Sequence, residues 1–137
     1  MKCKVVNNTA AVTEFRRQHS SGITPHNFGP CQQFRELAIN GMTINLMQNA
    51  NCVHIDGNIG LVKNIISNGQ GTYLIYHKFL EVLDFFDYPL SSQKLGICSV
   101  AKLSNKIFIS DINKLSYKCV ILPGRQKFVV IPLSYYI

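Results

Sequence analysis

The sequence lacks the long apolar segments that cross or enter membranes. No run approaches the roughly 18 consecutive apolar residues of a transmembrane helix. The first 22 residues, MKCKVVNNTAAVTEFRRQHSSG, contain two early lysines but no apolar stretch of signal-peptide length. We therefore expect an intracellular protein that has no membrane partner.

Clustered cysteines are missing too. The five cysteines are scattered, no C-x-x-C pair occurs, and only Cys52 lies within four residues of a histidine. Zinc sites of the common kind need closely spaced pairs of ligands, so we expect no metal site. Cys52, Cys98 and Cys119 each have apolar neighbours, which is typical of buried thiols in a reduced, intracellular protein.

Motifs for nucleotide binding and catalysis are also absent. GNIGLVK and NGQGTYL have glycine spacings similar to phosphate loops, but strand-forming residues follow them where a phosphate loop needs a helix. No G-x-S-x-G or H-E-x-x-H motif occurs. His54 and His77 could come near Cys52 or Cys98 in space, but their spacing does not require a catalytic pair. We expect no cofactor and no enzymatic activity, and an enzyme of unrecognised type ranks last among our hypotheses.

Charged residues are few, at 15%, yet the net charge is +7. Residues 1–35 carry +4, residues 36–93 carry −3, and residues 94–137, with seven basic residues against Asp111 alone, carry +6. Such an uneven distribution suits contact with nucleic acid or with an acidic protein, whereas the alternative is a solvated surface that keeps the protein soluble. The candidate contact residues are Lys102, Lys106, Lys114, Lys118, Arg125 and Lys127.

The first part of the chain is rich in residues that interrupt regular structure. NNTA, HSSG and TPHNFGP supply Asn, Ser, Gly and Pro at short intervals. Residues 10–18 are long enough for two helical turns. We interpret residues 1–32 as a flexible N-terminal arm or a remnant of a preceding region, and residues 33–137 as a β domain.

The β domain is marked by three hairpin signals, Asn40-Gly41, Asp56-Gly57 and Asn68-Gly69. Both central positions of such turns require positive φ, and the turns join antiparallel neighbours. The segments between them alternate apolar and polar residues, as half-buried strands do. Gly60, inside one of these segments, indicates a bulge or a bend where the sheet closes. A β-meander is the topology that this stretch predicts.

The pattern breaks beyond Glu81, where residues 82–86 are consistent with one or two helical turns that Pro89 ends. Ser110-Asp111 favours another short helical turn. Residues 120–122 and 129–131 are apolar on both faces and flank a turn at Gly124, which is typical of interior strands. The predicted fold class is all-β with one short helical insertion, a small antiparallel meander that closes into a partly open barrel.

Aromatic residues gather beside acidic ones in the middle of the chain. Near Glu81, Asp84 and Asp87, aromatic rings could cage a methylated lysine by cation–π attraction, as in a chromatin-type small-barrel reader. The alternative is a packed core with tyrosine hydroxyls at its rim. The cage candidates are Tyr73, Tyr76, Phe86 and Tyr88.

Two blocks carry a family resemblance: GNIGLVKNIISNGQGTYLIYHKF, and the closing segment that contains DINKLSYKCVILPGRQKFVVIPL. Together they resemble the C-terminal tail of animal transposase-like proteins related to CACTA-type DNA transposons. In that family the tail follows the nuclease domain and lacks the catalytic acids. The resemblance therefore implies a non-catalytic accessory domain of a transposase-derived nuclear protein. It assigns no functional residue, and the arm lies outside it.

Overall fold

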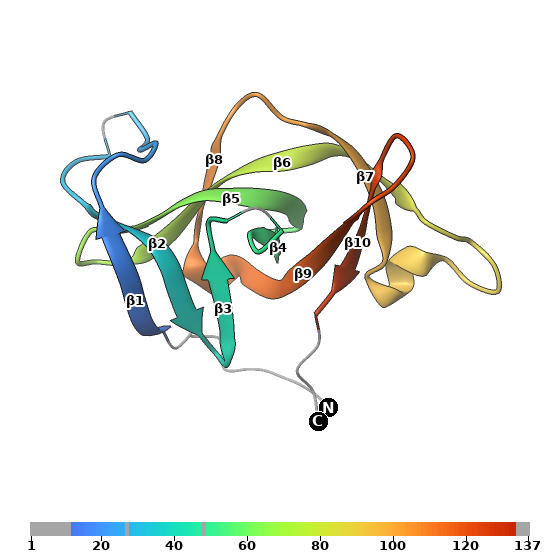
Figure 1. The fold of residues 1–137 in the computed structure, drawn as a ribbon, viewed down its shortest axis with the longest axis horizontal. Coiled ribbons are helices and arrows are strands. Elements are labelled where there is room, and N and C mark those ends of the chain that lie inside the picture. The colour runs from blue at the N-terminus through green and yellow to red at the C-terminus, as the bar shows by residue number, and fades with distance from the viewer. Residues whose placement is uncertain (1–11, 27, 48, 134–137) are drawn as a thin grey trace.

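The fold consists of antiparallel strands, as Figure 1 shows. A computed structural model describes residues 12–26, 28–47 and 49–133. The described segments contain ten strands and two short 3-10 helices. Their bounds are β1 Val12–His19, β2 Gln32–Ile39, β3 Met42–Asn45, β4 Cys52–Ile55, β5 Asn58–Ser67, β6 Thr72–Asp84, η1 Ser92–Leu95, β7 Cys98–Leu103, β8 Phe108–Asp111, η2 Ile112–Lys114, β9 Leu115–Pro123 and β10 Phe128–Pro132. The predicted all-β class is confirmed.

Six of the strands close into a ring. Following hydrogen-bonded neighbours, the ring runs β5, β4, β9, β10, β7 and β6, and β6 pairs with β5 again. The long strands β5 and β6 extend beyond the ring, where β5 pairs with β2 and β6 pairs with β8 (Figure 1). There β1 and β3 pair with β2. The predicted closure of the meander therefore takes the form of a ring with a lateral extension.

The hairpin turns lie where the sequence predicts them. Asn40-Gly41 joins β2 to β3 and Asp56-Gly57 joins β4 to β5, and all four residues have positive φ. Gly69 lies in the loop between β5 and β6 with φ 85°. The turn at Gly124 joins β9 to β10, and both of these strands are paired on two sides, as expected for interior strands. The short helical turn after Asp111 is confirmed as η2.

Two local predictions were wrong. Residues 82–84 are the end of β6 rather than a helix, because Val82 pairs with Val100 and Leu83 with Ser99 across β7. The helical insertion lies later, at η1. Residues 12–18 are likewise extended, since β1 pairs along β2, so this part of the predicted arm belongs to the sheet. Residues 1–11 lie outside the described part of the chain.

The side chains form two hydrophobic clusters on opposite faces of β4, β5 and β6. We call the first the ring core, because all six ring strands contribute to it: Cys52, Ile59, Phe79, Cys98, Val100, Cys119 and Val130. We call the second the outer core, because β2, β3 and η2 cover the outer face of the ring with it: Phe34, Leu37, Ile39, Ile44, Val53, Ile55, Val62, Ile65, Leu74, Tyr76 and Ile112. Successive side chains of a strand point to opposite faces, so β4 and β5 each contribute residues to both clusters.

Gly60 lets β5 and β6 approach between these two cores. A Cβ atom at this position would lie 2.6 Å from the His77 carbonyl oxygen and 2.8 Å from the Tyr76 ring. The register shift predicted near Gly60 occurs between Val62 and Asn64, where Lys63 is the additional residue in β5. Gly60 therefore provides close contact between the strands, and the bulge lies just beyond it.

Candidate functional site

Two of the predicted basic residues share one carboxylate. The ammonium groups of Lys127 and Lys102 lie 2.9 Å and 3.5 Å from the two Glu81 oxygens. The hydrogen bond and charge of Lys127, followed by the weaker influence of Lys102, lower the pKa of Glu81. This arrangement brings β6, β7 and the β9–β10 turn together, and it leaves more positive than negative charge on that side of the ring.

The β9–β10 turn also forms one wall of a shallow hollow of about 300 Å³, which we call the turn face. Gly124 closes the turn by donating its N–H to the Lys127 carbonyl oxygen at 2.7 Å, and a Cβ at Gly124 would lie 2.6 Å from that oxygen. The side chain of Phe85 at the wall is 56% exposed. The turn face is lined by Phe85, Ser99, Gly124, Arg125, Gln126, Lys127 and Val129. It therefore combines two cations with an exposed aromatic ring and no acidic side chain.

The other predicted basic residues lie elsewhere. Lys118 donates to the Thr43 carbonyl oxygen at 2.6 Å, which ties β9 to β3. Lys106 lies over the Phe108 ring, 5.7 Å from its centroid, where Lys78 is also found at 4.6 Å. Lys114 is exposed in η2. Thus the structure gathers Lys102, Arg125 and Lys127 and separates the remaining three from them.

The four aromatic cage candidates are not gathered. Tyr76 is buried, stacks on Phe108 and shares a 2.8 Å hydrogen bond with Ser110, so it belongs to the core. Tyr73 meets Phe28 edge to face at 5.5 Å. Phe86 and Tyr88 lie past the other end of β6, and the strand rises about 26 Å from Tyr76 to Asp84, at about 3.3 Å per residue. The described rings therefore do not form the predicted cage.

The carboxylate beside these rings has a structural role. Asp84 accepts hydrogen bonds from the Ser91 hydroxyl and from the backbone and side chain of Gln93. These bonds, that of Ser91 first, lower the pKa of Asp84. Asp87 is exposed in the loop that follows. Asp84 thus fixes the segment that leads into η1.

The histidines and thiols are arranged as packing groups. His54 stacks on Tyr117 with ring centroids 4.8 Å apart, its buried Nδ1 atom has no partner in the described structure, and burial lowers its pKa. His77 Nδ1 lies 3.2 Å from the Lys106 carbonyl oxygen. The Cys119 thiol contacts the Cys52 thiol, and this contact together with burial raises the pKa of Cys119. A protonated, enclosed thiol is a poor nucleophile.

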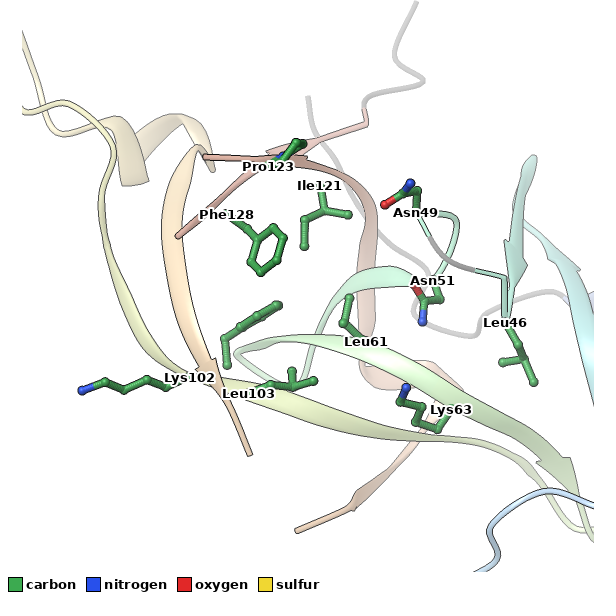
Figure 2. Close-up of a pocket in the computed structure, with 11 residues that line it drawn as sticks. Leu46, Asn49, Asn51, Leu61, Lys63, Lys102, Leu103, Ile121, Pro123 and Phe128 are labelled. Atoms are coloured by element: carbon green, nitrogen blue, oxygen red, sulfur yellow. The ribbon is translucent and has the colours of Figure 1, made fainter. Parts of the chain in front are cut away.

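A pocket of about 640 Å³ lies at one end of the ring, and none of the sequence patterns predicted it. We call it the ring pocket. Figure 2 shows Leu61, Ile121 and Phe128 directed into a shared space, while Lys102 extends away from it. The pocket is lined by Leu46, Asn49, Asn51, Leu61, Lys63, Phe79, Lys102, Leu103, Ile121, Pro123 and Phe128. Five strands and one loop supply these residues, so no local motif could predict the pocket.

Within the described residues, no group of three or more His, Cys, Asp or Glu side chains is placed to hold a metal ion. No helix found there combines the length and the apolar character needed to span a bilayer.

Comparison with known proteins identifies a family but no characterised relative. Residues 18–133 match the family model described as a domain of unknown function, DUF8592, so the chain belongs to that family. The matched segment runs from the last residues of β1 to the end of β10 and includes both cores. No curated protein matches, and no solved structure matches.

Proposed function

We propose that this chain is a non-catalytic interaction domain that binds an acidic segment of a protein partner at the turn face. The observation that carries the proposal is the composition of this surface: Arg125 and Lys127 lie beside the exposed Phe85 ring, and no acidic residue lines the hollow. Glu81 neutralises part of the Lys127 and Lys102 charge. Arg125 remains exposed, and a guanidinium binds carboxylates through paired hydrogen bonds.

A protein partner fits this surface better than nucleic acid does. Nucleic-acid affinity grows with the number of phosphates that are neutralised together, whereas the predicted cations are spread over separate parts of the molecule. An exposed apolar side chain lies beside Val129 of the turn face: Leu122, which pairs with Val129, is 44% exposed. An apolar centre next to charged groups is the usual composition of a protein interface.

The buried thiols and the packed histidines support the non-catalytic part of the proposal. A nucleophile needs a positioned base and access to a substrate. Cys52 and Cys119 are enclosed in the ring core, and the described contacts of His54 and His77 are an aromatic stack and a backbone carbonyl. The origin in a transposase-derived protein and the nuclear location rest on the sequence resemblance, and both stay predictions.

The test is a binding measurement with a fluorescein-labelled, glutamate-rich peptide that contains one phenylalanine. We expect saturable binding that weakens between roughly 50 and 200 mM salt, because the contact depends on charge. The double substitution Arg125→Glu with Lys127→Glu should weaken binding by at least about tenfold, the loss that corresponds to 1.4 kcal/mol.

The matched control reverses two cations outside the turn face, Lys106→Glu with Lys114→Glu, and should leave peptide affinity nearly unchanged. Equal losses in the two double variants would show that overall charge, rather than the turn face, attracts the peptide. A DNA duplex that binds more tightly than the peptide at the lower salt would replace the protein partner by nucleic acid.

A further inference from the structure

The ring pocket has the size and lining of a small-molecule site. Ligand sites usually enclose about 300–1,000 Å³ with mostly apolar walls and a few polar groups. The pocket here measures about 640 Å³. Its apolar wall comes from Leu46, Leu61, Phe79, Leu103, Ile121, Pro123 and Phe128.

The polar side of the pocket is cationic. No acidic side chain lines it, whereas Lys63 and Lys102 do. The Lys102 ammonium pairs with Glu81 and points away from the centre in Figure 2. Lys63 is exposed and forms no ion pair with another described residue, so its charge is available to a ligand.

Local backbone structure places Lys63 at the pocket. It is the additional residue at the bulge of β5, where the register with β6 shifts, and a bulge redirects the side chain it carries. Asn51 is joined to β5, the strand that carries Lys63, by two hydrogen bonds. Its side-chain amide donates to the Val62 carbonyl oxygen at 3.0 Å, and the Val62 N–H donates to the Asn51 carbonyl oxygen at 2.8 Å. In Figure 2 the Lys63 ammonium rises toward Asn51.

We infer that the ring pocket binds an amphipathic carboxylate, an unbranched hydrocarbon chain with a single anionic head group. The chain would lie against Leu61, Phe128 and the other apolar side chains. The carboxylate would meet the Lys63 ammonium and an N–H of the Asn51 amide. Charge complementarity selects this class of ligand, because a cationic amphiphile would face Lys63 with no acid in the wall.

The experiment uses the full chain and the sodium salts of hexanoate, octanoate and decanoate, each below its micelle-forming concentration, in isothermal titration calorimetry. Each added CH₂ that enters the pocket should raise affinity about three- to fourfold. Decanoate should bind at least tenfold more tightly than decyltrimethylammonium, whose chain has the same length.

Lys63→Met keeps the aliphatic stem and removes the charge, so it should weaken decanoate binding about tenfold and abolish the preference over the cationic amphiphile. Lys94→Met, an exposed site in η1, is the matched control and should bind as the unsubstituted protein does. If Lys63→Met lowers the melting temperature, Lys63→Gln repeats the test with a polar side chain of similar length.

Absence of saturable decanoate binding, or equal affinity in the Lys63 and Lys94 variants, would overturn the inference. Binding of decanol as tight as that of decanoate would also overturn it, because a neutral amphiphile makes no use of the Lys63 charge. The inference stands apart from the turn face: the Lys63 variants should bind the glutamate-rich peptide normally, so each proposal can fail alone.

Discussion

The outer core and the ring core share strands β4, β5 and β6 but differ in what lies beside them. In the outer core Leu37, Ile39, Ile44, Ile65 and Leu74 have no exposed surface, and β2, β3 and η2 cover them. In the ring core Cys52, Val100 and Val130 are just as fully buried, but the largest side chain, Phe79, lines the ring pocket. A strand whose side chains alternate between two faces can thus contribute to a closed hydrophobic core on one face and line a ligand pocket on the other.

The largest effect is expected in the outer core. Leu74→Ala removes a fully buried side chain from close-packed neighbours and leaves a cavity, so the free energy of unfolding should fall by about 3 kcal/mol. Chemical denaturation followed by circular dichroism measures this change. A loss below about 1 kcal/mol would show that the outer core is loosely packed, which contradicts the comparison.

The corresponding change in the ring pocket should cost less. Leu103→Ala removes a half-buried side chain that already borders open space, so we expect a loss of about 1 kcal/mol in the same denaturation experiment. The variant should also bind decanoate more weakly, because part of the apolar wall is gone. A loss equal to that of Leu74→Ala would mean that the ring pocket is as tightly packed as the outer core.

The smallest effect concerns His54, which lies where the ring strands β4 and β9 meet. Burial lowers its pKa in the folded state below the ordinary value of 6.5, so the unfolded chain binds a proton more readily. Stability should therefore fall as pH falls below about 6.5, until the folded-state pKa is reached. The stacked neighbour Tyr117, whose pKa burial raises to about 12, stays neutral throughout this range.

His54→Phe keeps the stack on Tyr117 and removes the titrating group. Unfolding free energies at pH 7.5, 6.0 and 5.0 should decline less steeply toward acid in the variant than in the unsubstituted protein. An unchanged pH dependence would show that His54 titrates in the folded protein as it does in the unfolded chain.

The sequence predicts the elements that depend on neighbouring residues. Asn40-Gly41 and Asp56-Gly57 specify their hairpins because both positions need positive φ, and the structure has these turns. Asp111 accepts a hydrogen bond from the Asn113 N–H at 2.8 Å and so begins η2. These features need no information from distant parts of the chain.

Features that depend on distant residues were missed. β1 has a mostly polar sequence, and its contacts are with residues far along the chain: Phe15 stacks on Phe34 at 4.5 Å, and Arg16 donates a hydrogen bond to Glu36 at 2.6 Å. The apolar residues 82–84 resemble part of a helix until pairing with β7 fixes them as strand. The ring pocket is harder still to predict, since β4–β9 and β10–β7 pairing must first close the ring.

The most direct test of the division between a sealed core and a binding end is a map of backbone amide shifts in ¹⁵N-labelled protein during separate titrations with decanoate and with the glutamate-rich peptide. Decanoate should shift the amide resonances of Leu61, Lys63, Leu103 and Phe128. The peptide should shift those of Ser99, Arg125 and Val129. The amide resonances of Ile39, Ile65 and Leu74, in the outer core, should change with neither ligand. Shifts concentrated in the outer core, or none at the ring pocket and the turn face, would contradict the account.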